Sequence, residues 1–285
     1  GNYNQALEFA NQVLNIANKL QDPEIKRDAL KLLVSIYHQK GDYQKALKIA
    51  QEHLVLLRQL RQTNKEFLGL LQVIKIYISL GYTTKAIENV NQALSIARQT
   101  KNIKEESLAL MWLGIIYSKQ GEYEKAIELG EQNLQIARKK QNFNGEVLAT
   151  SLMIEAYIAL GKYSKVIAVT EAAITLAKKI NNRVQRVNLL IHLGNAYKNL
   201  GDYTKGKDLV EQGLNIARDM KIPALESRAL NELGSIYSSQ NNYQKALELT
   251  QQSLKIAKNL TSPPLKLFPL FNLGEIYTKL GQYQK

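Results

Sequence analysis

The chain repeats one pattern every forty residues, and this repetition limits its possible folds more than any other feature. "GDYQKALKIAQEHLVLLRQL" begins at Gly41, "GYTTKAIENVNQALSIARQT" at Gly81 and "GEYEKAIELGEQNLQIARKK" at Gly121. The same slot recurs at Gly1, Gly41, Gly81, Gly121, Gly161, Gly201, Asn241 and Gly281. Periods of about 20–50 residues are typical of solenoids, in which each repeat packs on its neighbours. We therefore expect one elongated array, a single domain over residues 1–285.

Tyrosine follows the same period. Fourteen of the fifteen tyrosines fall into two slots. One slot holds Tyr37, Tyr77, Tyr117, Tyr157, Tyr197, Tyr237 and Tyr277, and the other holds Tyr3, Tyr43, Tyr123, Tyr163, Tyr203, Tyr243 and Tyr283. Such regularity indicates that these side chains pack between helices.

Each period contains two amphipathic helical patterns. In one repeat, Leu110, Leu113 and Tyr117 are spaced i, i+3, i+7, and Ala126 and Leu134 belong to a second stripe. Gly121 marks the turn between the two patterns. The pattern predicts helix A at about 23–40 and helix B at about 43–60, recurring every forty residues, with no strand.

The start of each helix A is also marked. One slot holds Asp22, Gln62, Asn102, Asn142, Asn182, Ile222 and Ser262, which are mostly residues that cap helix N-termini. Proline follows at Pro23, Pro223 and Pro263, where the first helical turn needs no N–H donor. We expect helix B alone at 1–22, full repeats at 23–62, 63–102, 103–142, 143–182, 183–222 and 223–262, and a partial repeat at 263–285.

The order of these residues resembles a known family. The series Leu110-x2-Leu113-Gly114-x2-Tyr117, followed by Gly121, Tyr123 and Ala126, is similar to the tetratricopeptide repeat. That resemblance implies an all-α solenoid, a right-handed superhelix of about seven hairpins, with helix A lining a concave groove and helix B outside.

The chain departs from the family pattern in three respects. Leucine replaces the usual first tryptophan, the closing proline is absent, and the period is forty residues instead of about 34. In this it resembles the extended repeats of spindle-orientation adaptors and bacterial arrays, which often adjoin a signalling, nucleotide-binding or protease-like domain. Both ends break the pattern, so we expect a piece of a longer protein. Pro269 inside the last helix A should kink or delay that helix.

Motifs for catalysis or metal binding are not found. Cysteine is absent, and His38, His53 and His192 lie far apart, outside any metal-binding spacing. Glu105 and Glu106 are consecutive, so on a helix they diverge. We expect neither an enzyme nor a cofactor. No apolar run reaches the length of a membrane span, and no signal peptide is visible, so we expect a cytoplasmic location.

The formal net charge of +13 raises the alternative of a nucleic-acid or anionic-surface binder. One cationic slot holds Lys45, Lys85, Lys125, Lys165, Lys205, Lys245 and Lys285, and another holds Arg58, Arg98, Arg138, Lys178, Arg218 and Lys258. Pairing with acids on the same helix and complementing the helix dipole are structural explanations for both slots. The tyrosines, committed to packing, are not available to stack on bases.

The family resemblance implies which helix A positions face the groove. Carried over by register, they are apolar in the second to fourth repeats and polar in the fifth and sixth. The candidate site residues are Leu68, Leu71, Lys75, Leu108, Met111, Trp112, Ile115, Glu155, His192, Asn195, Arg228 and Asn231.

We expect an apolar peptide or helix to dock in this groove as the protein partner. The single tryptophan, Trp112, would be its main anchor. In the alternative, longer helices shift the register and bury Leu68, Leu108 and Leu148 between repeats. A regulatory or sensor array attached to another domain is a further alternative, and the oligomeric state is open.

Overall fold

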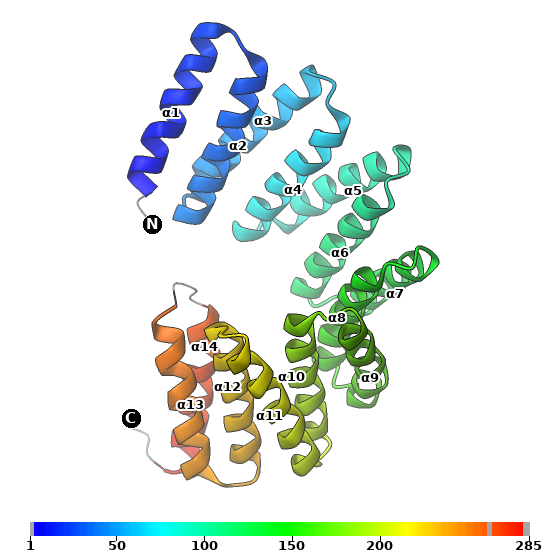
Figure 1. Ribbon diagram of the computed structural model, residues 1–285, viewed down its shortest axis with the longest axis vertical. Coiled ribbons are helices and arrows are strands. Elements are labelled where there is room, and N and C mark those ends of the chain that lie inside the picture. The colour runs from blue at the N-terminus through cyan, green and yellow to red at the C-terminus, as the bar shows by residue number, and fades with distance from the viewer. Residues whose placement is uncertain (1–2, 261–263, 282–285) are drawn as a thin grey trace. The chain divides into compact units, whose positions relative to one another are not determined.

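The computed structural model describes residues 3–260 and 264–281, and these residues form fourteen helices and no strand (Figure 1). The helices are α1 (Tyr3–Leu20), α2 (Pro23–Lys40), α3 (Tyr43–Gln59), α4 (Thr63–Ser79), α5 (Thr83–Gln99), α6 (Ile103–Lys119), α7 (Tyr123–Lys139), α8 (Phe143–Ala159), α9 (Tyr163–Lys179), α10 (Arg183–Asn199), α11 (Tyr203–Asp219), α12 (Pro223–Ser239), α13 (Tyr243–Lys258) and α14 (Pro264–Lys279). The even-numbered helices are helix A and the odd-numbered ones are helix B. An all-α solenoid with a forty-residue period is confirmed.

The turns between helix A and helix B follow the predicted glycine slot. Gly41 ends α2 in the left-handed conformation, with φ of 83°, and its N–H donates to the His38 carbonyl. Asn241, which replaces glycine in one repeat, takes the same conformation at φ of 61°. This region suits glycine because it has no Cβ to clash, and asparagine tolerates it better than most residues.

The turns between helix B and the next helix A use a second left-handed residue. In the six turns of this kind before α2, α4, α6, α8, α10 and α12 it is not glycine: Gln21, Arg61, Lys101, Gln141, Asn181 and Lys221 all have φ of 52° or 53°. The following residue caps helix A, as predicted for most repeats. Asp22 accepts hydrogen bonds from two backbone N–H groups of α2, whereas Gln62 and Ile222 make no side-chain cap bond. The predicted cap Ser262 and proline Pro263 lie outside the described residues.

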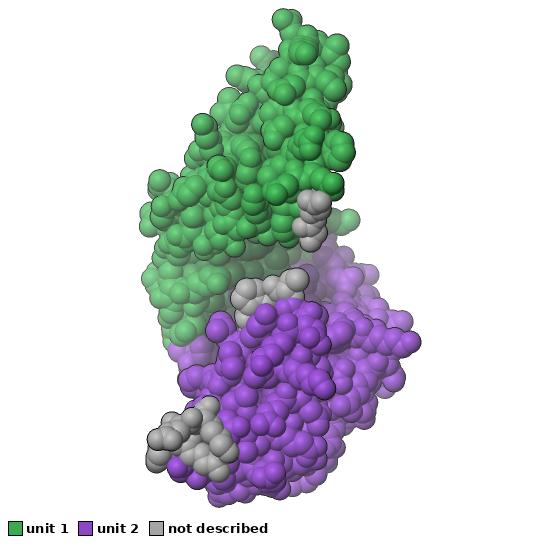
Figure 2. Space-filling model, turned by 90° about the vertical axis from the view of Figure 1, so that its left-hand side faces the viewer, with its two compact units in different colours: residues 1–136 green, residues 137–285 purple. Residues whose placement is uncertain are grey.

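The chain divides into two compact units, residues 1–136 (unit 1) and residues 137–285 (unit 2) (Figure 2). In unit 1, the large side chains of Phe67, Leu70 and Ile74 on α4 are fully buried. Ala46 and Ala86 on the neighbouring B helices belong to the same core, where their small side chains leave room for the larger ones. Unit 2 has its own cores. The single repeat domain over residues 1–285 stays a prediction.

Salt bridges join the end of several B helices to the start of the next helix A. Arg58 Nε lies 2.7 Å from Glu66 Oε1, and Arg98 Nε lies 2.9 Å from Glu106 Oε1. In unit 2, Arg218 Nε lies 2.8 Å from Glu226 Oε1. The arginine slot that the sequence predicted to complement the helix dipole therefore also links consecutive hairpins.

Three lysines of the helix B slot lie against tyrosines of the helix A slot. The distance from Nζ to the ring centroid is 5.8 Å for Lys45 and Tyr37, 5.1 Å for Lys125 and Tyr117, and 4.1 Å for Lys205 and Tyr197. These are cation–π contacts, which attract a cation to the ring face. In these three repeats the contacts give the lysine and the tyrosine a common structural role.

Helix α14 runs through Pro269 without interruption. The helix is therefore not delayed to that proline, and this part of the prediction was wrong. Pro269 lacks the N–H that would bond to the Leu265 carbonyl, but the lost bond does not end the helix.

Candidate functional site

Unit 1 contains a cavity of about 390 Å³ between its first helices. It is lined by Arg27, Asp28, Lys31, His53, Leu57, Lys65, Leu68, Leu71, Gln72 and Lys75, from α2, α3 and α4. Three leucines supply the apolar surface. Leu57 and Leu71 are buried, whereas the Leu68 side chain is 54% exposed. An exposed leucine beside a cavity can contact a partner without disturbing the core.

The charged groups around this cavity are mostly cations. Arg27 pairs with Asp28 at 2.8 Å and also with Glu24, so its charge is neutralised inside the unit. Lys31 and Lys75 form no ion pair within the part of the chain that the structure describes. Two lysines beside an apolar surface therefore remain able to meet acidic groups of a partner.

His53 on α3 has a structural role. Its Nδ1 lies 3.2 Å from Gln72 Oε1, and the side chain is buried. Burial lowers its pKa, and the hydrogen bond to Gln72 opposes this only in part. The imidazole is therefore neutral at pH 7 and joins α3 to α4.

The other predicted residues of unit 1 lie on α6 and are not among the residues that line this cavity. Leu108, Met111, Trp112 and Ile115 are half-buried. Leu108 and Trp112 pack against the core of unit 1, and Lys75 Nζ lies 5.7 Å from the Trp112 ring centroid. Trp112 is thus partly a core residue.

The three leucines that the alternative register would bury differ in their exposure. Leu68 and Leu148 are 54% and 41% exposed, so neither is buried between hairpins. Leu108 is half-buried, between the two readings. Leu71, which we expected to face a partner, is only 7% exposed and belongs to the core.

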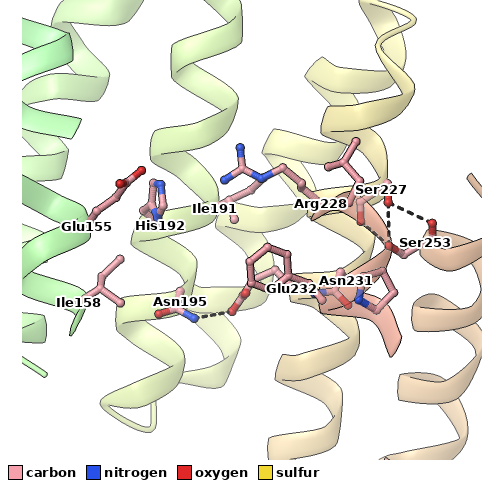
Figure 3. A pocket seen from close by; sticks show the side chains of 13 residues that line it. Glu155, Ile158, Ile191, His192, Asn195, Ser227, Arg228, Asn231, Glu232 and Ser253 are labelled. Atoms are coloured by element: carbon pink, nitrogen blue, oxygen red, sulfur yellow. Dashed lines mark hydrogen bonds between the residues drawn. The ribbon is translucent and has the colours of Figure 1, made fainter. Parts of the chain in front are cut away.

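Unit 2 contains a second cavity, of about 280 Å³ (Figure 3). All five predicted site residues of this unit line it: Glu155, His192, Asn195, Arg228 and Asn231. They come from three successive A helices, α8, α10 and α12. The remaining lining residues are Ile158, Ile191, Ser227, Glu232, Ser253, Leu265, Phe268 and Pro269.

Opposite charges face this cavity from its two sides. Figure 3 shows Glu155 on α8, His192 on α10 and Arg228 on α12 in one row. Arg228 donates one hydrogen bond, from Nη1 to Asn188 Oδ1 at 2.7 Å. Neither Arg228 nor Glu155 forms an ion pair with any described residue.

The pKa values record the surroundings of these groups. Loss of surrounding water raises the pKa of Glu155, and the Arg228 charge opposes this. Burial lowers the pKa of Arg228, and Glu155 and Glu232 oppose that shift. Burial, followed by the Arg228 charge, lowers the pKa of His192 to about 4, so this imidazole is neutral at pH 7.

The polar groups at the other edge of the cavity are satisfied by one another. Asn195 Nδ2 donates to Glu232 Oε1 at 2.9 Å, and Lys198 Nζ donates to the same oxygen at 3.0 Å. Asn272 Nδ2 donates to Asn231 Oδ1 at 3.0 Å. Glu232 and the Asn231 side-chain oxygen are therefore hydrogen-bonded within the protein. Glu155 and most of the Arg228 guanidinium remain able to bond to a ligand.

Sequence reasoning missed the contribution of α14. Phe268 and Leu265 line the cavity, and Phe268 is 67% exposed. Phe268 occupies the same forty-residue slot as Leu68 and Arg228, so the register could have predicted it as a site residue. The prediction left out Phe268 because Pro269 was expected to kink or delay the last helix A.

Among residues 3–260 and 264–281, no group of three or more histidine, aspartate or glutamate side chains is placed to hold a metal ion. None of the helices described is both long enough and apolar enough to cross a membrane.

Comparison with known proteins agrees with the sequence pattern. Models of the tetratricopeptide repeat match residues 225–285, residues 29–63 and 109–142, and residues 75–100 and 187–220. None of the curated proteins compared with the chain matches it.

Three solved structures illustrate the similarity in fold. The signal transduction ATPase with numerous domains and a tetratricopeptide repeat sensor from Pyrococcus horikoshii has a TM-score of 0.72 and 19% identity, over 93% of this chain and 42% of its own. A Rap protein complexed with competence and sporulation factor has a TM-score of 0.62 and 16% identity, over 91% and 77% of the two chains. BtubC from P. vanneervenii has a TM-score of 0.53 and 17% identity, over 92% and 94%. At these identities the similarity extends to the fold alone.

Proposed function

Because the chain belongs to the tetratricopeptide repeat family, we propose that it is a protein–protein interaction scaffold that binds a peptide segment on its A helices. Tetratricopeptide repeats generally mediate such interactions and are generally not catalytic. The Rap protein of similar fold, complexed with competence and sporulation factor, supports a peptide as the kind of partner.

The observation that carries the proposal is the unit 1 cavity. Leu68 is 54% exposed beside the buried Leu71, and Lys31 and Lys75 line the same cavity without an acidic partner among the described residues. The leucines offer apolar surface and the lysines offer positive charge. The bound segment therefore carries an apolar side chain with acidic residues beside it.

A peptide-display selection on the purified chain tests this proposal. The selection is run in parallel on Leu68→Ser and on Val55→Ser, a control in unit 1 whose side chain is 50% exposed on α3, outside the cavity. We expect peptides with an apolar residue beside acidic ones to be enriched on the parent and on Val55→Ser but lost on Leu68→Ser. Failure to enrich any such peptide on the parent, or equal enrichment of them on both variants, would contradict the proposal.

A sensor array attached to another domain is a second candidate. The P. horikoshii protein of similar fold is described as having a tetratricopeptide repeat sensor, and this chain spans 42% of that protein. A sensor also needs a surface that recognises its signal. Adding a selected peptide to the longer protein and measuring the activity of the neighbouring domain distinguishes a sensor from a passive scaffold.

The nucleic-acid alternative relies on the cations of helix B. Several of these cations have partners inside the protein, such as Lys125 with Glu122 at 2.7 Å and Arg98 with Glu106 at 2.9 Å. A binding constant for single-stranded DNA that falls steeply with salt would favour this alternative.

A further inference from the structure

The unit 2 cavity holds two opposite charges that do not neutralise each other directly. Glu155 and Arg228 come from α8 and α12, with His192 of α10 between them (Figure 3). Each charge affects the pKa of the other group, yet no ion pair joins them. They are therefore near enough to interact and too far apart to bond.

The same helices form a direct ion pair nearby. Lys198 of α10 and Glu232 of α12 lie 3.0 Å apart, and Asn195 completes that network. Water can still reach Glu155, whose side chain is exposed at the cavity edge. A partly desolvated charge without a partner costs free energy that a bound group of opposite charge can recover.

We infer that the unit 2 cavity binds a peptide segment carrying one acidic and one basic side chain, the acid meeting Arg228 and the base meeting Glu155. This inference rests on the proposed function and names the ligand chemistry of a second site within it. It differs from the acidic and apolar segment proposed for unit 1.

The chemistry of the two groups supports this pairing. A guanidinium offers a planar fork of N–H donors that matches a carboxylate, and Arg228 uses only Nη1, in its hydrogen bond to Asn188. The Glu155 carboxylate accepts N–H donors of lysine or arginine and makes no hydrogen bond to a described residue. His192, neutral at pH 7, adds no charge between them.

A dipolar segment suits the cavity better than a single ion. A lone anion at Arg228 would be repelled by Glu155 and Glu232, and a lone cation at Glu155 would be repelled by Arg228. In an extended segment, side chains at i and i+2 point the same way, about 6.6 Å apart. An acid at i and a base at i+2 can therefore both face one cavity.

The walls of the cavity fit the rest of such a segment. Ile158, Ile191 and Phe268 are apolar and can pack against the stems of the charged side chains. The unit 1 cavity is not equivalent, because the one acid among its lining residues, Asp28, is paired with Arg27 at 2.8 Å.

The test is a selection from a displayed library of random twelve-residue peptides, on the parent chain, Arg228→Gln and Glu155→Gln. We expect the parent to enrich peptides with an acidic and a basic residue two positions apart. Arg228→Gln should lose only the preference for the acid, and Glu155→Gln only the preference for the base. Lys221→Gln and Asp208→Asn, which remove the same charges at exposed positions of unit 2 outside the cavity, should leave both preferences intact.

An enriched peptide is then synthesised with its acid replaced by glutamine. The replacement should weaken binding about tenfold to the parent and leave binding to Arg228→Gln unchanged. Identical charge patterns on the parent and both cavity variants would overturn the inference.

Failure of this inference is distinguishable from failure of the proposed function. Enrichment that is lost on Leu68→Ser but unaffected by Arg228→Gln and Glu155→Gln keeps the scaffold and overturns the dipolar site. A parent that enriches no peptide overturns both.

Discussion

Lys198 Nζ lies 3.0 Å from Glu232 Oε1, and this ion pair joins α10 to α12 with side chains only 13% and 15% exposed. Lys198 also donates to Ser235 Oγ at 3.0 Å, and Asn195 donates to the same Glu232 oxygen at 2.9 Å. Each charged group therefore takes part in two hydrogen bonds. This network holds two consecutive hairpins of unit 2 together beside its cavity.

Removal of one member of the pair leaves the other charge poorly solvated. We expect Glu232→Gln to lower the free energy of unfolding by about 2 kcal/mol, measured by urea denaturation. The double variant Lys198→Gln with Glu232→Gln should lose less than the sum of the two single variants.

An exposed pair provides the control. Lys245 and Glu248 lie 2.8 Å apart, with side chains 44% and 51% exposed. Glu248→Gln should change the free energy of unfolding by less than about 0.5 kcal/mol. Equal losses in Glu232→Gln and Glu248→Gln would show that burial does not strengthen the pair between the hairpins.

Leu68 and Leu71 are three residues apart on α4 and differ in what they contact. Leu71 is 7% exposed, so Leu71→Ala should cost about 2–4 kcal/mol of unfolding free energy through the cavity it leaves. Leu68 is 54% exposed, so Leu68→Ala should cost less than about 1 kcal/mol. The same denaturation experiment compares the two, and a larger loss for Leu68→Ala would contradict the exposure of that side chain.

The sequence did not predict which of these two leucines is buried. Both leucines match an apolar helical stripe, and three residues turn a helix almost one full turn, so the pattern places them side by side. Which of them faces the next helix depends on how the helices tilt against each other. That tilt depends on packing across hairpins, and the repeat period does not contain it.

The sequence predicted some features of the turns and missed others. Gly41 and Asn102 act through their own backbone and side chain, so local sequence was enough to predict a left-handed turn and a helix cap. Gln21 and Lys101 adopt φ of 53° although neither favours it. Their conformation follows from the helices on either side, so these residue types alone did not predict it.

The register predicted which residues line the unit 2 cavity, but not how their charges pair. Glu155, His192 and Arg228 occupy equivalent faces of successive A helices, so the period alone brought them into one cavity. The period does not say which charges pair. That Lys198 selects Glu232 and leaves Arg228 without an acidic partner depends on distances between side chains on different helices.

His192 should make the stability of unit 2 depend on pH. The unfolded side chain takes up a proton near pH 6.5, its ordinary pKa, while the folded one does so only near pH 4. The unfolded state therefore binds more protons between these values, and stability falls as the pH drops from about 6.5 to about 4. The full effect is about 1–3 kcal/mol.

Comparison with His192→Gln isolates this contribution. Glutamine does not titrate, so the variant should lose less stability than the parent over the same pH range, measured as the midpoint of thermal unfolding. Glu155 on α8 and Arg228 and Glu232 on α12 face His192 in both proteins, so their own titration is common to the two curves. Parallel curves for the two proteins would contradict the prediction.

Gly194 and Gly274 occupy the same forty-residue slot and should respond oppositely to alanine. A Cβ on Gly194 of α10 would clash with Val210 and would lie 2.8 Å from the Gly206 carbonyl oxygen, a backbone atom that cannot move aside easily. Gly194→Ala should therefore destabilise unit 2 by about 2 kcal/mol or more.

Gly274 on α14 is the matched control, because a Cβ there meets no atom within 4 Å. Alanine is the better helix former, so Gly274→Ala should raise the free energy of unfolding by about 0.5–1 kcal/mol. Urea denaturation of the two variants against the parent measures both effects. A stabilising Gly194→Ala would mean that α10 and α11 do not approach as closely as this structure has them, because only their close approach makes alanine unfavourable in this slot.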